Sequence, residues 1–198
     1  MPSESITDLV ADHLTPEEQT LLLELARSSI EQTLEGKGLI PLVLDDFPIA
    51  LRQQGSSFVT LKVEERLRGC VGALEAFLPL AEDVRKHAIG AALFDYRFPP
   101  LRLYELPEMR IEISRLKPTR PLHYTCPEDL LISLRPGIDG VVLMDEQRRA
   151  TFLPKVWLTI PEPDIFLSLL CQKMGAPPDT WRKKMLSILT YEVEDFQE

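Results

Sequence analysis

The sequence is poor in the residues from which disulfide frameworks and metal centres are built. Its three cysteines, Cys70, Cys126 and Cys171, are odd in number and far apart, and none belongs to a CxxC pair. Neither a disulfide framework nor a zinc site is therefore indicated, and a reducing cytoplasm fits best. The sequence also lacks motifs of the HExxH, GxGxxG and P-loop types, so we expect no metal and no cofactor.

Positive charge is also scarce. Lysine and arginine number 22 against 31 aspartates and glutamates, which gives a net charge of −9 and a pI near 5.0. This balance argues against nucleic acid as a partner, and an accessory role in RNA modification fits it poorly. The stretch from Ser3 to Asp12 lacks the basic and apolar regions of a signal peptide, and no apolar run approaches membrane-spanning length. We therefore expect a cytoplasmic protein that does not enter a membrane.

The chain is long enough to bury a substantial core. Residues 1–14 form a lead-in, and residues 15–198 are predicted to form a single domain of two closely packed subdomains. Thr15-Pro16-Glu17-Glu18 predicts the start of a helix, with Thr15 as the cap, Pro16 in the first turn and Glu18 completing a capping box. Gly36 and Gly38 predict its end.

The same order of elements is predicted twice. A hairpin over 58–73, turning near Glu64-Glu65, is followed by a helix over 80–94 and a strand over 109–116. A hairpin over 141–154, a helix over 165–174 and a closing strand over 186–196 repeat this order about 80 residues later. We therefore predict an α+β fold of duplicated β-β-α-β units, with mostly antiparallel sheets covered by helices.

The strand over 67–73 carries the first candidate site. Side chains alternate along a strand, so Arg68, Cys70 and Gly72 are predicted to share one face. A cation beside a thiol favours the thiolate, and Gly69 and Gly72 leave bare backbone that a ligand or another segment of the chain could approach closely. The alternative is a small thiol buried beneath closely packed strands.

Two further segments supply candidate residues. His87 lies at the edge of the apolar stripe of the helix over 80–94, which should pack on the hairpin, so His87 is the best candidate base for a thiol. A partly buried, hydrogen-bonded histidine is the alternative. After that helix, Pro99 and Pro100 fix where Asp95 and Arg97 point. These two residues could pin the turn as an ion pair, or Arg97 could bind a ligand.

Five motifs occur in an order that resembles the AMMECR domain family, the A component of the AmmeMemoRadiSam system. They are Leu67-Arg68-Gly69-Cys70-Val71-Gly72, Asp95-Tyr96-Arg97-Phe98-Pro99-Pro100-Leu101, Ile113-Ser114, Gly137-Ile138-Asp139-Gly140 and Thr151-Phe152-Leu153-Pro154-Lys155-Val156-Trp157. The resemblance runs from about residue 15 to the C-terminus. It implies a two-subdomain α+β fold with a cleft near the first motif, and an association with a Memo-like protein and a radical SAM enzyme. It implies no settled activity.

Two functions are compatible with these residues. In the first, the protein is a thiol-dependent enzyme or modification protein, with Cys70 as nucleophile or redox group, Arg68 stabilising the thiolate or an anionic substrate, and His87 as base. The substrate, a small molecule or a protein, would be bound by residues of the motifs: Gly69, Gly72, Asp95, Arg97, Phe98 and Ser114. In the second, the protein is a non-catalytic binding module that docks a partner through the Cys70 strand and the Phe98-Pro99-Pro100 loop.

Overall fold

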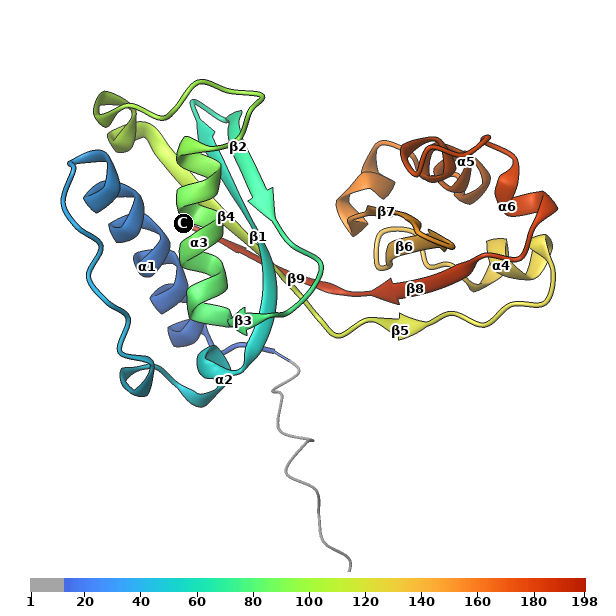
Figure 1. Cartoon of the computed structure of the whole chain (residues 1–198), viewed down its shortest axis with the longest axis horizontal. Coiled ribbons are helices and arrows are strands. Elements are labelled where there is room, and N and C mark those ends of the chain that lie inside the picture. The colour runs from blue at the N-terminus through green and yellow to red at the C-terminus, as the bar shows by residue number, and fades with distance from the viewer. Residues whose placement is uncertain (1–12) are drawn as a thin grey trace, which may run out of the picture. The chain divides into compact units, whose positions relative to one another are not determined.

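The computed structural model describes residues 13–198, which divide into two units. The first contains the described residues up to Leu116 together with Glu194–Glu198, and the second is Lys117–Val193. Each unit has its own antiparallel sheet and its own helices (Figure 1). The predicted mixed α+β class is therefore confirmed. Within the described residues, no helix is both long enough and apolar enough to cross a membrane.

The first unit begins with the predicted capped helix. Thr15 accepts a hydrogen bond from the backbone of Glu18, and the Glu18 side chain accepts one in return, so the capping box is present. Gly36, with a φ of +70°, follows the helix. The elements of this unit are α1 (Pro16–Leu34), η2 (Leu44–Asp46), α2 (Ile49–Arg52), β1 (Gln54–Val63), β2 (Arg66–Gly72), β3 (Leu78–Pro79), α3 (Leu80–Leu93), η3 (Leu103–Glu108), β4 (Met109–Leu116) and β9 (Val193–Gln197).

The hairpin of β1 and β2 turns where the sequence predicts, at Glu64 and Glu65. Both residues have positive φ, 49° and 60°, which a two-residue hairpin turn of type I′ requires. The register then shifts, because Lys62 pairs with Leu67 whereas Leu61 pairs with Gly69. Arg68 is therefore the extra residue of a β-bulge, and the alternation of side chains is broken at this position.

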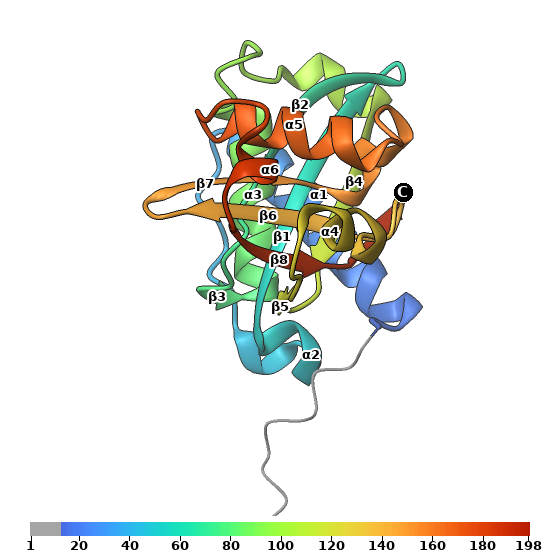
Figure 2. The same ribbon diagram turned by 90° about the vertical axis from the view of Figure 1, so that its right-hand side faces the viewer.

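The sheet of the first unit has the strand order β2-β1-β4-β9, with the short β3 also paired to β1. Figures 1 and 2 both show α1 and α3 on the same face of this sheet. Val59 and Leu61 of β1 and Ile111 and Ile113 of β4 are fully buried in the core with these helices. The residues of β1 and β4 that alternate with these core residues lie on the other face of the sheet, and Thr60 is one of them.

The second unit repeats the combination of a hairpin, a helix and a strand. Its sheet has the order β5-β8-β6-β7, and Phe166 of α5 belongs to its core and stacks on Trp157, with ring centroids 3.6 Å apart. The predicted hairpin over 141–154 and helix over 165–174 are both present. The elements are β5 (Arg120–Pro121), α4 (Pro127–Ser133), β6 (Gly140–Asp145), β7 (Arg148–Phe152), η4 (Pro154–Leu158), α5 (Pro163–Lys173), α6 (Thr180–Lys183) and β8 (Ser187–Tyr191).

The expected closing strand over 186–196 is wrong as a single element. The segment is divided at Glu192 into β8, which pairs with β6 of the second unit, and β9, which pairs with β4 of the first. Phe196 of β9 accordingly belongs to the core of the first unit. Apolar alternation continues across the division, so the sequence pattern alone does not reveal the change of sheet.

Candidate functional site: the Cys70 edge of the first sheet

Cys70 lies on the face of the sheet opposite to the helices. A Cβ added at Gly69 would lie 2.1 Å from the carbonyl oxygen of Ala91 in α3, and one added at Gly90 would lie 3.1 Å from Val71. Gly69 and Val71 therefore face α3, and Cys70 between them faces the other way. Its side chain is half-buried, and the hydroxyl of Thr60, directly across the hairpin, donates a hydrogen bond to Sγ at 3.3 Å.

The backbone of Cys70 is held by the loop that follows α3. β2 is an edge strand, so one side of it has no neighbouring strand. The N–H of Cys70 donates to Oδ2 of Asp95 at 2.8 Å, and Nη2 of Arg97 donates to the Cys70 carbonyl at 3.2 Å. At this point of the edge, these two side chains thus make the backbone hydrogen bonds that a neighbouring strand would otherwise make. The first and second sequence motifs are joined by this contact.

Asp95 and Arg97 form a tight ion pair. Nε and Nη2 of Arg97 donate to the two carboxylate oxygens at 2.9 and 2.6 Å. The hydrogen bond from Arg97 holds the pKa of Asp95 well below its usual range, aided by backbone N–H donors and opposed by burial, and Asp95 in turn raises the pKa of Arg97. The Asp95 side chain is only 3% exposed, whereas that of Arg97 is 45% exposed. Since Nε and Nη2 are occupied, Nη1 remains to bind an anion.

Arg68 does not stabilise the thiol in the way expected. Its guanidinium forms a two-point ion pair with Glu105 at 2.7 and 3.0 Å, and it donates to the carbonyls of Pro99 and Pro100 at 2.7 and 3.2 Å. The hydrogen bond from Arg68 also lowers the pKa of Glu105. Because the bulge displaces Arg68 and these four acceptors engage it, its role in the structure is to hold the proline loop against β2.

His87 is not brought to Cys70. It projects from α3, which packs on the opposite face of the sheet, where its Nδ1 lies 3.1 Å from Oδ2 of Asp83. The hydroxyl of Ser57 donates to the same oxygen at 2.7 Å. The helix does pack on the hairpin as predicted, but it does so through Gly69 and Val71. The expected Cys70–His87 pair is therefore absent from the described residues.

The remaining predicted site residues are engaged within the protein. The bare face of Gly69 is covered by α3, and a Cβ at Gly72 would lie 2.4 Å from the ring of Phe58, so neither glycine leaves space for a ligand. The hydroxyl of Ser114, which is buried, donates to Asp195 at 2.5 Å and links β4 to β9. Phe98 is half-buried, with the Arg97 guanidinium 5.4 Å from its ring centroid.

Sequence reasoning missed two residues of this site, Thr60 and Glu105. Counting pairs outward from the turn at Glu64-Glu65 without a bulge sets Thr60 opposite Gly69, and only the register shift at Arg68 brings it opposite Cys70. Glu105 lies in η3, outside the five motifs. The site as found offers a thiol, a hydroxyl donor and a fixed guanidinium. Among residues 13–198 there is no group of three or more His, Cys, Asp or Glu side chains arranged to hold a metal ion.

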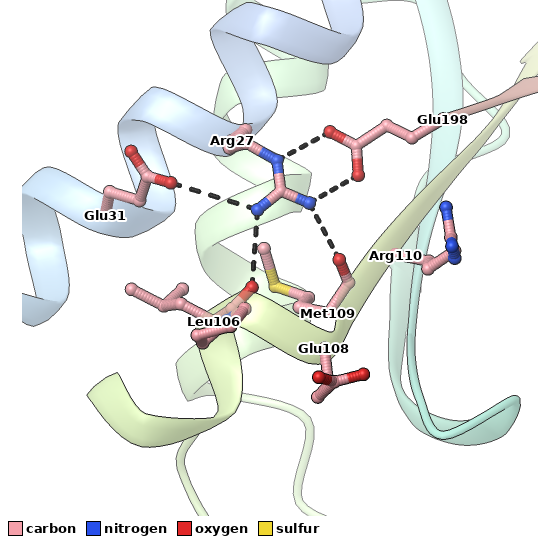
Figure 3. A pocket seen from close by; sticks show the side chains of 8 residues that line it. Arg27, Glu31, Leu106, Glu108, Met109, Arg110 and Glu198 are labelled. Carbon is pink, nitrogen blue, oxygen red and sulfur yellow. Dashed lines mark hydrogen bonds and ion pairs between the residues drawn. The ribbon is translucent and has the colours of Figure 1, made fainter.

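A cavity of about 490 Å³ elsewhere in the first unit is lined by residues of an ion-pair network (Figure 3). Arg27 of α1 donates to both carboxylate oxygens of Glu198, at 2.6 and 2.5 Å, and to the carbonyl of Met109 at 2.7 Å. Glu198 also accepts from the backbone of Ile111 and raises the pKa of Arg27. This network ties α1 to β4 and to the residue after β9, so we assign it a structural role.

Comparison with known proteins agrees with the family resemblance of the five sequence motifs. A protein of Methanothermobacter thermautotrophicus is 34% identical over 190 residues, covering 93% of this chain and 96% of the relative, and one of Methanocaldococcus jannaschii is 34% identical over 188 residues, covering 93% and 92%. The crystal structure of uncharacterized protein PH0010 from Pyrococcus horikoshii is 32% identical, covers 93% of both chains and superposes with a TM-score of 0.83. The AMMECR1 family model matches residues 23–196. The chain therefore belongs to the AMMECR1 family.

Proposed function

We propose that the protein is a thiol-dependent enzyme or modification protein in which Cys70 is the nucleophile and Arg97 binds an anionic group of the substrate. The observation that carries this proposal is the three-point fixing of Cys70: its N–H by Asp95, its carbonyl by Arg97 and its sulfur by Thr60. A nucleophile held in one orientation beside a fixed cation needs little reorganisation when the substrate binds.

The hydroxyl of Thr60 supplies the electrostatic part of the proposal. It donates to the sulfur, so it stabilises negative charge that develops there when the thiol loses its proton. Arg97 is well placed for the substrate, because two of its nitrogens are anchored and the third lies on a half-exposed side chain. Arg68 and His87 have no part in this chemistry, since each is engaged elsewhere.

A pair of alkylating agents of similar size tests the proposal. Iodoacetate carries a carboxylate, whereas iodoacetamide is neutral. A cation that binds anions near Cys70 should therefore raise the rate for iodoacetate relative to that for iodoacetamide. A change in access to the sulfur should affect both rates equally and leave their ratio unchanged. We expect Arg97→Gln to lower the iodoacetate-to-iodoacetamide ratio about fivefold, as loss of roughly 1 kcal/mol of charge interaction implies. Arg52→Gln, which removes another surface arginine paired with an aspartate, should leave the ratio unchanged.

The proposal fails if Cys70 is labelled only after denaturation. It also fails in its assignment of Arg97 if both arginine variants change the ratio equally. Labelled sites should be assigned by mass spectrometry, with Cys126 as the internal comparison, because it too is half-buried.

The second candidate function, a non-catalytic binding module, is favoured by the exposed apolar side chains beside the same loop. Tyr96 is 96% exposed and Tyr104 is 81% exposed, and the loop between them is held rigidly by Arg68 and Asp95. Exposed aromatic side chains on a rigid support are typical of docking surfaces. In this proposal the partners are a Memo-like protein and a radical SAM enzyme.

Binding to these partners can be separated from thiol chemistry. With a purified Memo-like protein and a purified radical SAM enzyme from the same organism, Tyr96→Ser with Tyr104→Ser should abolish binding if the loop docks a partner, while Cys70→Ser should retain it. Calorimetry would measure both. Loss of binding in Cys70→Ser but not in the tyrosine variant would contradict the docking proposal.

We also infer that the two units are copies of one β-β-α-β unit. The strand orders β2-β1-β4-β9 and β7-β6-β8-β5 support this inference, because each sheet has its hairpin at one edge and the strand after the helix next to the first hairpin strand. Superposition of the two units in a crystal structure tests it. Equivalent strands that cannot be superposed together with α3 on α5 would contradict the duplication.

A further inference from the structure

A second cavity in the first unit lies beside α3, away from Cys70. Val71 lines it, and the side chain of Val71 is on the face of the sheet opposite to Cys70. The cavity has a volume of about 580 Å³, within the range of roughly 300–1,000 Å³ that is usual for small-molecule sites. Its lining is mainly apolar and includes Phe94, which is 76% exposed. Large apolar groups left at the surface around a cavity often mark a ligand site.

The imidazole of His87 is the buried polar group of this lining. Its Nδ1 lies 3.1 Å from Oδ2 of Asp83, and the hydroxyl of Ser57 donates to the same oxygen at 2.7 Å. An ionised carboxylate only accepts hydrogen bonds, so Nδ1 of the neutral ring carries the proton and donates it to Asp83. Nε2 is then left as a hydrogen-bond acceptor, held in one orientation by Asp83.

This acceptor is satisfied by nothing in the part of the chain that the structure describes. Nε2 of His87 has no hydrogen-bond partner among residues 13–198, yet protein atoms do not enclose it completely. Because His87 is only 6% exposed and lines the cavity, we infer that Nε2 is open toward the cavity. A ligand that brings one O–H or N–H group would satisfy Nε2, whereas an apolar ligand that excluded water would leave it unpaired.

The charges around the cavity are balanced. Arg85, Lys86 and Glu82 line it, and Asp83 is hydrogen-bonded to His87. With the imidazole neutral, the two cations are offset by the two anions. Arg85 donates to a backbone carbonyl, and Lys86 is exposed to solvent. A charged ligand would therefore lose its hydration without meeting an excess of opposite charge, which favours an uncharged ligand.

The spacing of His87 and Phe94 along the chain bears on the size of this ligand. They are seven residues apart, which corresponds to two turns and about 10 Å along a helix. A molecule of two fused rings is long enough to reach from one to the other, whereas a single ring is not. Phe94 presents an exposed aromatic ring, and aromatic pairs are stabilised beyond their buried area, so an aromatic body is favoured over an aliphatic one.

We propose that this cavity binds an uncharged aromatic molecule of two fused rings with one O–H or N–H donor, the chemical class of naphthols and indoles. The donor binds Nε2 of His87, and the far ring packs against Phe94. The aliphatic side chains of the lining, Leu39, Val71, Leu78 and Ile89, cover the rest of the ligand. This site goes beyond the thiol function and needs neither Cys70 nor Arg97.

The fluorescent probe 2-naphthol tests the location of the site. Titration at pH 7.5, above the ordinary imidazole pKa of about 6.5, should show saturable binding. Phe94→Ala should weaken it about fivefold, as loss of an aromatic contact implies. Tyr104→Ala is the matched control, because Tyr104 is an exposed aromatic outside the cavity, and it should leave the affinity unchanged. Both positions are exposed, so thermal unfolding should confirm that each variant is folded. No saturable binding, or equal weakening in both variants, overturns the proposal.

Three analogues of the probe test the chemistry of the ligand. In 2-methoxynaphthalene the donor is lost, and we expect binding about fivefold weaker, as loss of one neutral hydrogen bond implies. Decahydro-2-naphthol keeps the donor but has no aromatic ring, and it should also bind more weakly. The charged 2-naphthoate should bind most weakly, and Lys86→Gln should leave the affinity for 2-naphthol unchanged. Equal affinity for the methyl ether or the saturated alcohol, or tighter binding of the naphthoate, overturns the proposed ligand class.

Nitrogen resonances of the imidazole rings give a direct readout without altering His87. In the free protein at pH 7.5, Nε2 of His87 should carry no proton. Its resonance should shift when 2-naphthol binds and should shift less with 2-methoxynaphthalene. The other two histidines of the chain, His13 and His123, are exposed, so their glutamine variants assign the remaining ring to His87. A protonated Nε2 in the free protein, or a resonance that 2-naphthol leaves unmoved, overturns the role of His87.

Discussion

Thr60 and Cys70 are joined across the hairpin by a hydrogen bond from the hydroxyl to the sulfur, 3.3 Å long. This contact depends on the bulge at Arg68. Without the extra residue, the register that begins with Val63 opposite Arg66 would place Thr60 opposite Gly69. An irregularity near the turn therefore determines which polar group faces the thiol.

Removal of this hydroxyl should slow the chemistry of Cys70. For Thr60→Val we expect alkylation by iodoacetamide at pH 7 to fall about fivefold, because a hydrogen bond worth roughly 1 kcal/mol to the charged sulfur is lost. Labelling of Cys126 in the same sample provides the control. Cys171 should react only after unfolding, since it is buried and burial raises the pKa of its thiol. An unchanged rate at Cys70 would show that Thr60 does not act on the sulfur.

Arg97→Gln should lower the free energy of unfolding at pH 7 by about 1–2 kcal/mol. The buried Asp95 would lose its cation, and the cost is below that of a fully buried pair because the Arg97 side chain is 45% exposed. Since the folded pKa of Asp95 is depressed, its contribution is complete above the unfolded value of about 3.9 and is lost as the pH falls below it. Urea titrations should therefore show a difference between wild type and variant that shrinks below about pH 4. A constant difference from pH 7 to pH 2.5 would contradict this account.

Arg68→Gln should destabilise the protein by about 2 kcal/mol, because a two-point ion pair and two carbonyl contacts are lost together. The alkylation rate of folded Cys70 should change less than twofold. Arg66→Gln on the same strand, at an exposed position, is the control for stability. A double-mutant cycle with Glu105→Gln should reveal coupling. If the rate falls while stability is kept, Arg68 does act on the thiol.

Gly69→Ala should cost about 3 kcal/mol in urea unfolding. The new Cβ would lie 2.1 Å from the backbone oxygen of Ala91, so α3 would have to move away from the sheet. Gly90→Ala, on the other side of the same contact, should change stability by no more than about 1 kcal/mol, since better helix propensity offsets a 3.1 Å approach to Val71. Similar costs at both positions would mean that the helix adapts more readily than this packing implies.

The parts of the fold that depend on local chemistry could be predicted from the sequence. The capping box at Thr15, the turn at Glu64-Glu65 and the helical spacing over 80–94 each involve residues close in the chain, and each is present. The division at Glu192 could not be predicted, because it depends on which strands β8 and β9 meet.

The candidate site was predicted only in part, because it depends on which side chains of β2 lie on each face of the sheet. The helix and hairpin do contact each other, but through Gly69 and Val71, which leaves His87 and Cys70 on opposite faces. One inserted residue removed Arg68 from the expected face. The adjacent Gly69 is the sequence signal for such a bulge, but the prediction treated it only as bare backbone open to close approach. The contact of Asp95 with Cys70 joins two motifs that the sequence shows only as separate segments.

The strand β9 has a consequence for biosynthesis. The sheet that carries Cys70 is built from residues up to Leu116 and from Val193–Gln197, whereas the second unit is continuous in the chain. During translation all the residues of the second unit emerge before the last strand of the first sheet, although most of that sheet is made earlier. The nascent chain must therefore keep an unfinished edge at β4 until β9 has been synthesised, and the edge is protected only when Phe196 reaches the core.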